Sequence, residues 1–492
     1  MIGGQWAGVG DPTEIALLAA AGKMGLDRTT LHAQFPRVSE RPFDSESSQM
    51  TTVHAVPSGP AGQYLVLVKG SPEILHADHH DGPFSHTWHD ALHESTEFAA
   101  RGFRVLAVAE GRSDRAEASA LVHLRLLGLV AINDPAKPAA RATIDSCRTA
   151  GIVPVLITGD HPATARAVAL SVGILMSDDA SASGLIMTGD EMAEGSVADL
   201  TTARVFARTS PAQKLEIIQA WQARGASIAM TGDGVNDGPA LRRADVGVAM
   251  GHRGTEVARQ SADLILADDD LETLIVSIEE GRRVYDNIRR FLVFGLAGGA
   301  AEISVMLIGP FVGLAVPLLA AQILWINLLT HGLTGVAIGA EPGEAGSMSR
   351  PPRPPEQSVL GDGLWQRVLA CGVVVAIVTV GVGLWAESSS RPWQSMIFVS
   401  LTCLQLGVAL GLRPRLFTRQ NPLLPLAILL SITLALAGLY VPLLQDLLGT
   451  VPLTAVEVAL AVLVGVAGLA VARATGWIAA RRRAPILARV TQ

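Results

Sequence analysis

The sequence is poor in cysteine, in aromatic residues and in charge. Its three cysteines, Cys147, Cys371 and Cys403, form no Cys-x-x-Cys pair, which excludes a disulfide framework and a cysteine-based metal site. Aromatic residues make up 4% of the chain and charged residues 17%, whereas soluble domains usually hold ~25% charged residues. This low charge, together with 49% hydrophobic residues, predicts that part of the chain lies in a lipid bilayer.

The net charge and the N-terminal residues argue against two further features, a nucleic-acid-binding surface and a signal peptide. A net charge of −7 argues against a nucleic-acid binder, which normally carries a basic face. The segment Met1-Ile-Gly-Gly-Gln-Trp6 has no basic region followed by an apolar core, so we expect no signal peptide. The length of 492 residues allows about three domains.

The second half of the sequence contains six apolar stretches of 18 or more residues, each long enough to cross a bilayer as a helix. Arginines flank them unevenly, and all but one of these arginines fall on one side if every stretch crosses. The positive-inside rule then predicts a multi-pass protein of the cell membrane with both termini in the cytoplasm. The stretches are Phe291–Gly309, Val316–Ile338, Val368–Trp385, Ser395–Leu412, Leu423–Leu444 and Val451–Val471. The flanking arginines are Arg282, Arg283, Arg289, Arg290, Arg350, Arg353, Arg413, Arg415, Arg419 and Arg481 to Arg483, with Arg391 on the other side.

The first half has an α/β pattern organised around Met230-Thr-Gly-Asp-Gly-Val-Asn-Asp-Gly-Pro-Ala-Leu241. The apolar run Ala226–Met230 predicts a buried strand, so Asp233, Asn236 and Asp237 fall on the loop at its end. Open α/β sheets place their ligand chemistry there, and carboxylates between small glycines suit Mg²⁺. The alternative is an Asp/Asn/Gly turn without chemistry.

A second loop of similar composition lies about 70 residues earlier. The predicted strand Val153–Ile157 ends in Thr158-Gly159-Asp160, and a predicted helix, Pro162–Val172, follows. A hydroxyl and backbone N–H groups at a helix start can hold a phosphate. Between the two loops, Lys214 lies on a predicted helix, Ala212–Gln222, where its alternative role is that of an ordinary surface lysine.

Thr231-Gly-Asp-Gly-Val-Asn-Asp237 resembles the hinge motif of the P-type cation-transporting ATPases of the calcium-pump-like type II, within the haloacid dehalogenase superfamily. The resemblance implies that Asp233 helps to hold Mg²⁺ and that Thr158, with Gly159, and Asn236 hold a phosphoryl group. It implies further that Lys214 neutralises the charge of that group, while Asp160 and Asp237 complete the network of loop contacts.

The first 120 residues resemble the nucleotide-binding domain of the same family. Arg41-Pro-Phe43-Asp-Ser-Glu46 and Lys69-Gly-Ser-Pro-Glu73 carry the resemblance, which implies that Phe43 stacks on the adenine of ATP and Lys69 lies on its phosphate side. Arg104 and Asp134 are further candidates for this cofactor site. The sequence departs from the family pattern at Ser47-Ser48, which stands where the family usually has a basic pair. Phe43 has an alternative role as an ordinary side chain of the hydrophobic core.

Two clusters of polar residues invite a metal-binding interpretation. Glu302 lies within the first apolar stretch and Asn327, Thr330 and His331 lie within the second, where they resemble the ion-binding positions of type II pumps. The calcium-pump pattern has an aspartate at the position of His331, so the resemblance implies a cation without implying calcium. The alternative is polar residues that only join helices. For the histidine-rich segment, a solvated insertion is favoured over a zinc site; its members are His76, His79, His80, His86, His89 and His93.

These patterns predict an α/β haloacid-dehalogenase-like (Rossmannoid) phosphorylation domain with a partial α+β nucleotide-binding domain, followed by an all-α membrane bundle of six helices. The predicted divisions are a partial nucleotide-binding domain at 1–120, the C-terminal part of the phosphorylation domain at 121–285, six transmembrane helices at 286–475 and a basic cytoplasmic tail at 476–492. The resemblance therefore covers nearly all of this chain, but only about the second half of a pump.

One piece of the family pattern does not occur in the sequence. The pumps phosphorylate an aspartate in an Asp-Lys-Thr-Gly-Thr motif after a strand, and no Asp-Lys dipeptide is found among these 492 residues. We therefore expect the C-terminal half of an ATP-driven cation pump that does not turn over alone: a fragment, the product of a truncated gene, or one half of a split pump whose separate N-terminal half carries the nucleophile. The alternatives are a non-catalytic membrane partner that binds nucleotide or Mg²⁺, and a degenerate pump remnant. A membrane-anchored phosphatase is disfavoured by the missing nucleophile.

Overall fold

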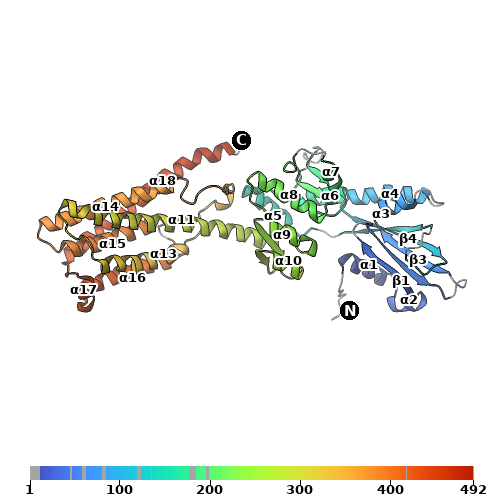
Figure 1. Ribbon diagram of the computed structural model, residues 1–492, viewed down its shortest axis with the longest axis horizontal. Coiled ribbons are helices and arrows are strands. Elements are labelled where there is room, and N and C mark those ends of the chain that lie inside the picture. Colours follow the sequence, from blue (N-terminus) through green and yellow to red (C-terminus); the bar gives the residue numbers. More distant parts are fainter. Residues whose placement is uncertain are drawn as a thin grey trace. The chain divides into compact units, whose positions relative to one another are not determined.

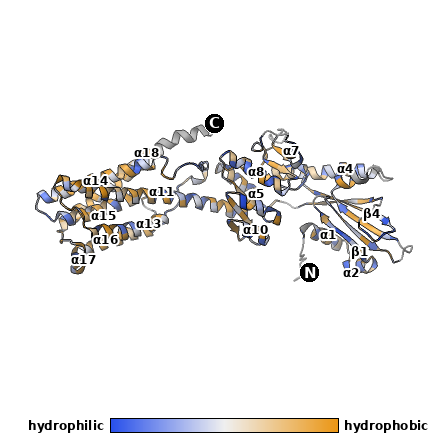
Figure 2. Cartoon of the chain, viewed as in Figure 1, coloured by the Kyte–Doolittle hydropathy of each residue, from blue (hydrophilic) through white to orange (hydrophobic). Residues whose placement is uncertain are grey.

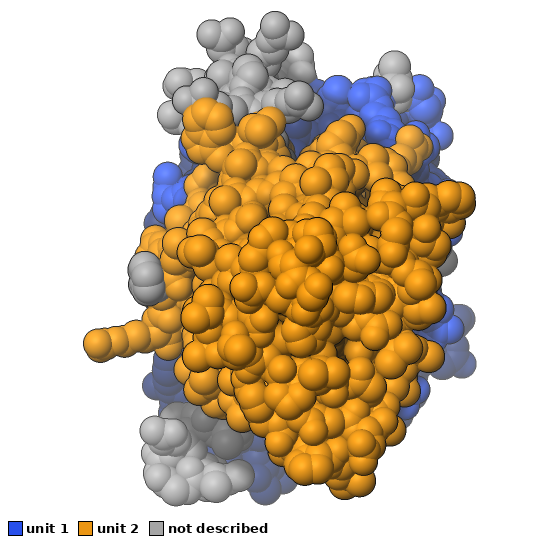
Figure 3. Space-filling model, turned by 90° about the vertical axis from the view of Figure 1, so that its left-hand side faces the viewer, with its two compact units in different colours: residues 1–148, 153–272 blue, residues 149–152, 273–492 orange. Residues whose placement is uncertain are grey.

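The computed structural model describes residues 11–44, 47–57, 63–79, 85–118, 123–133, 136–176, 184–195, 199–416 and 418–490. The chain divides into two compact units, which Figure 3 shows in different colours. Residues 1–148 and 153–272 form the first, which we call the α/β unit. Residues 149–152 and 273–492 form the second, which we call the helical unit.

The N-terminal part of the α/β unit is a five-stranded antiparallel sheet with the strand order β1-β2-β3-β4-β5, drawn in blue colours in Figure 1. Burial alternates along β2 and β3, so one face of the sheet packs on a core that contains Val53, Val66, Leu75 and Trp88. The strands are β1 (Arg37–Asp44), β2 (Gln49–Ala55), β3 (Tyr64–Gly70), β4 (Arg104–Ser113) and β5 (Arg125–Ile132). The helices are α1 (Pro12–Lys23), α2 (Arg28–Gln34), α3 (Pro72–His79) and α4 (Ser85–Ala100).

Strand β5 differs from its sequence prediction. The apolar run Leu126–Ile132 predicts a buried strand at the start of the parallel α/β region, but β5 pairs antiparallel with β4, from Arg104↔Ile132 to Glu110↔Arg125. Its residues are exposed or half-buried, since it is the end strand of this sheet. A continuous apolar run identifies a strand but does not identify its neighbour.

The rest of the α/β unit contains two separate parallel sheets of three strands each. Their orders are β6-β8-β7 and β11-β10-β9, and helices of moderate length connect the strands. The strands are β6 (Leu156–Ile157), β7 (Ile186–Thr188), β8 (Val205–Ala207), β9 (Ala229–Gly232), β10 (Val246–Met250) and β11 (Leu264–Leu266). The helices are α5 (Ala140–Thr149), α6 (Pro162–Val172), α7 (Gly189–Ala193), α8 (Pro211–Ala223), the 3-10 turn η2 (Val235–Asp237), α9 (Gly238–Arg243) and α10 (Glu256–Ser261).

Among the described residues, the helical unit contains six helices that are long and apolar enough to cross a membrane, as the sequence predicts. Figure 2 shows hydrophobic residues concentrated along these helices. The candidate spans are Leu271–Val312, Ala320–Gly339, Leu364–Ser388, Trp393–Gly411, Leu423–Tyr440 and Ala455–Ala479. The elements are α11 (Leu271–Ile308), η3 (Gly309–Val312), α12 (Ala320–Trp325), η4 (Ile326–His331), α13 (Gly332–Gly339), η5 (Ser347–Ser349), α14 (Leu364–Ser388), α15 (Trp393–Gly411), α16 (Leu423–Tyr440), α17 (Pro442–Leu448) and α18 (Ala455–Val490).

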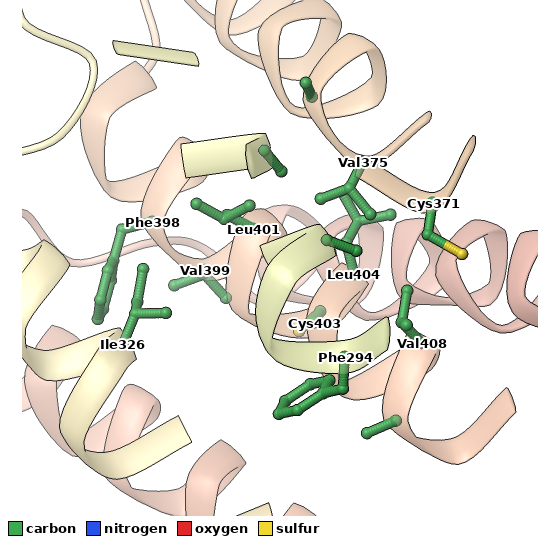
Figure 4. Close-up of a cluster of buried hydrophobic side chains, with 14 of the residues drawn as sticks. Phe294, Ile326, Cys371, Val375, Phe398, Val399, Leu401, Cys403, Leu404 and Val408 are labelled. Carbon is green, nitrogen blue, oxygen red and sulfur yellow. The ribbon is translucent and has the colours of Figure 1, made fainter. Parts of the chain in front are cut away.

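Helix α15 is the centre of the helical unit, and most of its residues are buried. Figure 4 shows Phe398 of α15 beside Ile326, and Leu404 of the same helix beside Val375 of α14. Helix α18 approaches α15 closely through glycine: a Cβ added to Gly465 would lie 2.8 Å from a backbone oxygen of α15. Close backbone approach through small residues is a common mode of helix packing in membranes.

A buried polar cluster ties four segments together at one end of the helical unit. Arg413 Nε lies 3.0 Å from Glu341 Oε1, and Asn421 Nδ2 donates to the same oxygen at 2.7 Å. Arg413 also donates to the Asn421 carbonyl at 3.0 Å, and Asn287 Nδ2 donates to the Glu341 carbonyl at 2.8 Å. Arg350 lies at the same end of the helical unit, because it forms an ion pair with Asp286, the residue before Asn287 in α11. We call Glu341, Arg413 and Asn421 the Glu341 cluster.

Candidate functional site

The loop after β9 contains the central acidic motif. Asp237 accepts a hydrogen bond at Oδ2 from Gly234 N at 3.1 Å, which closes the turn. A Cβ added to Gly232 would lie 2.6 Å from the Asp237 Cβ, so the loop can fold this tightly only with glycine there. Asn236 is exposed at the tip of the same loop.

Lys214 reaches this loop from helix α8. Ser210 caps the helix and forms a capping box with Gln213, and Pro211 follows at the first helical position, so the sequence fixes where α8 begins. One turn later Lys214 Nζ lies 2.6 Å from Asp237 Oδ1, and both side chains are mostly buried, with 16% and 13% exposed. The surface-lysine alternative is therefore wrong.

The loop after β6 meets the start of the same helix. Thr209, the residue before the Ser210 cap, donates to the Thr158 carbonyl from both its N–H and its hydroxyl, each at 3.2 Å. Thr158 Oγ1 donates to Asp160 Oδ2 at 3.0 Å and accepts from Asp160 N at 3.1 Å. The beginning of α8 thus joins the two motif loops, whose Thr-Gly-Asp sequences begin 73 residues apart, at Thr158 and Thr231.

Asp233 has an exposed side chain at the carboxyl end of β9, while its backbone carbonyl accepts from Thr255 N at 2.8 Å. Among the described residues no group of three His, Cys, Asp or Glu side chains could hold a metal ion. Mg²⁺ often binds through one or two carboxylates together with phosphate and water, so Asp233 fits as one ligand of such a site.

The predicted nucleotide residues lie near one another on the antiparallel sheet. Phe43 lies on β1 where the β1–β2 register shifts, and 59% of it is exposed, so it is not core packing. Lys69, at the end of β3, pairs in register with Met50 of β2 and forms an ion pair with Glu14 of α1. Glu14 was not predicted from the sequence; it lies in the first turn of α1, where Asp11 caps the helix.

The other two residues predicted to bind the nucleotide, Arg104 and Asp134, are not found with Phe43 and Lys69 among the described contacts of the antiparallel sheet. Arg104 lies with the loop after β6, because its guanidinium forms an ion pair with Asp160, and its Nε donates to Asp160 Oδ1 at 3.1 Å. Asp134 lies outside the described residues. Of the histidine-rich segment, His80 also lies outside them, whereas His89 and His93 lie on α4.

A further charged cluster beside Asp160 was not predicted. Glu73 of α3 lies 3.3 Å from Arg208 and 3.7 Å from His161 Nε2. Arg208 has φ 50°, a left-handed conformation that is uncommon for a residue with a side chain. Burial opposes ionisation of Glu73, but the Ser71 hydroxyl, a backbone N–H, Arg208 and His161 outweigh it and lower the pKa of Glu73. These contacts tie α3 to the loop after β6 and to the loop after β8.

His161 should make the stability of the α/β unit depend on pH. Its Nδ1 accepts from Ala163 N at 3.2 Å as the N-cap of α6, which requires an unprotonated Nδ1. Burial lowers the pKa of His161 below its usual 6.5, although Glu73 opposes this. The unfolded chain therefore binds a proton at His161 more readily than the folded chain does. As a result, the free energy of unfolding should be highest above about pH 6.5 and should fall as the pH falls through the pKa of His161 in the folded chain.

The variant His161→Asn isolates this effect, because asparagine also caps helices but does not titrate in this range. Thermal unfolding between about pH 7.5 and 5 should show a smaller loss of stability in the variant than in the parent chain. Protonation of His161 can remove from the parent chain at most the stabilisation of a helix cap, which is about 1 kcal/mol. Identical pH profiles for the two proteins would assign no role to His161.

In the helical unit, Glu302 forms the centre of a polar cluster in which Glu302 and Gln405 are buried and Asn327 is exposed. Asn327 Nδ2 donates to Glu302 Oε2 and Gln405 Nε2 donates to Glu302 Oε1, both at 3.0 Å. Asn327 Oδ1 lies 3.0 Å from His331 Nδ1, and the His331 ring packs edge-on against Phe294 with centroids 5.0 Å apart. Glu302 is 5% exposed and Gln405 is 1% exposed.

The local backbone explains which predicted residues join this cluster. Ile326–His331 forms a π-helical turn, η4, in place of the α-helix that the spacing of Asn327, Thr330 and His331 predicts. Such turns are rare and are often found at functional sites. Thr330 is buried, and its carbonyl accepts from the hydroxyl of Thr334; among the described residues it is not joined to Glu302. Gln405 was not predicted, because one amide in a long apolar stretch gives no pattern.

Comparisons with known proteins agree with this arrangement. Residues 2–139 match the family described as "P-type ATPase, cytoplasmic domain N", and residues 315–478 match "Cation transporting ATPase, C-terminus". A "Probable cation-transporting ATPase F" from Mycobacterium tuberculosis is 41% identical over 400 residues, 78% of this chain and 43% of that protein. A "Calcium-transporting ATPase" from Bacillus subtilis is 36% identical over 476 residues, 92% of this chain and 53% of that protein.

The chain thus spans about half the length of the curated relatives that it matches. The matched part contains the antiparallel sheet, the two parallel sheets and the six long apolar helices. The chain belongs to the P-type cation-transporting ATPases, resembles their calcium-transporting members, and extends from the cytoplasmic domain N to the C-terminal membrane region.

Proposed function

We propose that this chain acts as the C-terminal half of an ATP-driven cation pump whose phosphorylated aspartate comes from outside these 492 residues. The observation that carries the proposal is the junction at α8, where Lys214 contacts the Asp237 loop and Thr209 contacts the Thr158 loop. Phosphoryl transfer depends mainly on positioning and on electrostatic stabilisation, and these loops offer groups for both.

In this proposal each loop residue has one task. Thr158, Gly159 and Asn236 hold the phosphoryl group, and Lys214 neutralises the charge that develops on it. Asp237 positions Lys214 through the 2.6 Å contact, and Asp233 supplies a ligand for Mg²⁺. When bound, Mg²⁺ neutralises phosphate charge. Phe43 and Lys69 hold ATP, and in the same proposal Arg104 and Asp160, which pair with each other here, line its phosphate side.

The transported cation binds at the Glu302 cluster. Glu302 supplies the one carboxylate, while Asn327 and Gln405 can present oxygen atoms if their amides turn; Thr330 is a further predicted ligand. Arg350 and Arg413 lie at the same end of the helical unit, which supports the prediction that this end and both chain termini face the cytoplasm. The boundaries at 120, 285 and 475 remain predictions.

Labelled ATP tests the proposal. Purified membranes should form an acid-stable phosphoenzyme only when this chain is co-expressed with an N-terminal half that carries Asp-Lys-Thr-Gly-Thr, and the label should lie on that half. Labelling of this chain alone would contradict the proposal. If neither arrangement is labelled but ATP or Mg²⁺ still binds, the chain is a non-catalytic membrane partner.

The variant Glu302→Gln should abolish cation transport by the two-part assembly. The substitution keeps the size of the side chain but replaces one accepting oxygen with an NH2 donor, so one of the two partner amides must turn. It also removes the carboxylate charge from the cluster. Vesicle uptake should fall by about 10²-fold or more, the scale expected when a key charge is lost, while thermal stability stays close to that of the parent. Glu387→Gln, at an exposed carboxylate of α14, is the matched control and should transport normally. Equal transport by both variants would remove Glu302 from the ion path.

A further inference from the structure

Two arginines of the helical unit lie inside candidate membrane spans. Arg367 belongs to the first turn of α14, and Arg473 lies in the last third of the span Ala455–Ala479 of α18. Measured along α18, Arg473 lies about 27 Å from the first residue of that span, close to the ~30 Å thickness of the hydrocarbon layer. Both arginines therefore lie near an edge of the apolar layer and not at its centre.

The side chain of Arg367 reaches α18 at Gly476. A Cβ added to Gly476 would lie 3.4 Å from Arg367 Nη2, so the guanidinium lies against the helix where the glycine leaves room. One turn further along α14, Cys371 Sγ lies 3.9 Å from Thr475 Oγ1. Gly476 and Arg473 are three residues apart on α18, so they are neighbours on its surface. We call Arg367 and Arg473, which meet at this contact of α14 with α18, the arginine pair.

Arg473 lies on a face of α18 that is turned away from the other helices. Val462 and Val466, at helical spacing on the same face, are exposed, and so is Trp477 one turn after Arg473. A different face of α18 packs on α15 through Gly465. In a bilayer the face with Arg473 contacts lipid, so this arginine needs a partner that the lipid layer can supply.

The guanidinium of Arg473 has donors without acceptors. Its Nε and Nη2 are enclosed and have no hydrogen-bond partner among the described residues. The end of the sequence supplies no anion for it, because no Asp or Glu follows Glu457. A cation that is held in apolar surroundings without a partner is unfavourable. A ligand with anionic oxygen atoms satisfies both the charge and the donors.

Tryptophans indicate the depth of the arginine pair in the membrane. Trp365 lies two residues before Arg367, Trp477 lies four residues after Arg473, and both side chains are exposed. Tryptophan is enriched at membrane–water interfaces, where its ring lies at the level of the lipid headgroups. Trp385, near the other end of α14, is exposed as well, so α14 carries a tryptophan near each end. The arginine pair therefore lies at headgroup depth.

We propose that the arginine pair binds the phosphate group of an anionic phospholipid between α14 and α18. Guanidinium groups bind phosphate oxygens through paired, charge-assisted hydrogen bonds. Basic sites between membrane helices at headgroup depth suit such lipids. The acyl chains lie along the exposed face of α18 that carries Val462 and Val466. This lipid joins two helices of the unit, and its binding does not depend on the proposed pump activity.

Thermal unfolding of the delipidated full chain in a neutral detergent tests the proposal. The probe is phosphatidylglycerol, and it is compared with diacylglycerol, which lacks the phosphate, and with inorganic phosphate, which lacks the acyl chains. Phosphatidylglycerol should raise the unfolding temperature, because it binds the folded chain, whereas the other two should not. An equal rise with inorganic phosphate would assign the arginine pair to a free anion, and an equal rise with diacylglycerol would assign the effect to acyl chains. Either result would overturn the proposal.

Matched variants locate the site. Arg473→Gln should weaken phosphatidylglycerol binding by about tenfold or more, because charge-assisted hydrogen bonds to the phosphate are lost. Gly476→Leu keeps both charges but fills the space beside Arg367 Nη2, so it should weaken binding as well. Arg419→Gln removes the same charge from an exposed arginine outside the candidate spans and should bind like the parent. Equal affinity of the Arg473→Gln and Arg419→Gln variants would overturn the proposal.

Native mass spectrometry gives a readout that is independent of stability. Released from micelles that contain phosphatidylglycerol, the parent chain should retain this lipid more often than Arg473→Gln does. Arg473→Lys serves if the glutamine variant does not fold: it keeps the charge but loses the planar fork, so its retention should lie below that of the parent. Retention by the folded Arg473 variants equal to that of the parent would overturn the proposal.

Discussion

Replacing Lys214 by alanine should slow phosphoenzyme formation by about 10²- to 10³-fold in the two-part assembly, the loss expected when one electrostatic donor is removed from a reacting group. The side chain contributes a mostly buried positive charge at the junction of the two motif loops. Its removal takes one counter-charge from the phosphoryl group. Among the described residues, it also takes from Asp237 the cation that pairs with it, while the Gly234 N–H still donates to Asp237. Single-turnover labelling with ATP measures this rate.

Two control variants, Lys23→Ala and Lys214→Arg, show whether the loss in Lys214→Ala comes from the missing charge at this position. Lys23→Ala changes an exposed lysine at the end of α1 and should leave the labelling rate unchanged. Lys214→Arg keeps the charge and should retain more activity than the alanine variant, because electrostatic stabilisation survives while the fine geometry changes. If the alanine variant is labelled as fast as the parent, Lys214 is only a structural partner of Asp237.

The elements that sequence reasoning found were those with local signals. Helix α6 runs from Pro162 to Val172 as predicted, because proline marks its start and Gly173, with φ 81°, ends it. The six membrane helices follow from composition alone, since the bilayer fixes their length. The order of the two motif loops also indicated the residues that α8 brings together, although their proposed roles remain predictions.

What could not be predicted depends on contacts between distant residues. The apolar run of β5 has no mark that distinguishes pairing with β4 from pairing in a parallel sheet, and the register that decides this is set by residues 15 or more positions away. Gln405 reaches Glu302 from a helix 103 residues later, and a single amide has no periodicity. The π-helical turn η4 also changes the face that Thr330 occupies, which a spacing argument based on the α-helix cannot anticipate.

The Glu341 cluster leads to the second large effect, on stability. Arg413→Leu should destabilise the helical unit by about 3–5 kcal/mol, because it leaves Glu341 as an uncompensated buried charge and takes a donor from Asn421. Arg413 and Glu341 are almost fully buried, with side chains 2% and 1% exposed, so water cannot replace the lost contacts. Unfolding in mixed micelles of increasing denaturing detergent measures the change.

The controls for this prediction come from the same loop. Arg415→Leu alters an exposed arginine two residues away and should change stability by no more than about 0.5 kcal/mol. Adding Glu341→Gln to Arg413→Leu removes the orphaned charge, so the double variant should recover part of the lost stability. If the single variants at 413 and 415 are equally stable, the ion pair contributes nothing. If the double variant is weaker than Arg413→Leu alone, the loss comes from packing and not from charge.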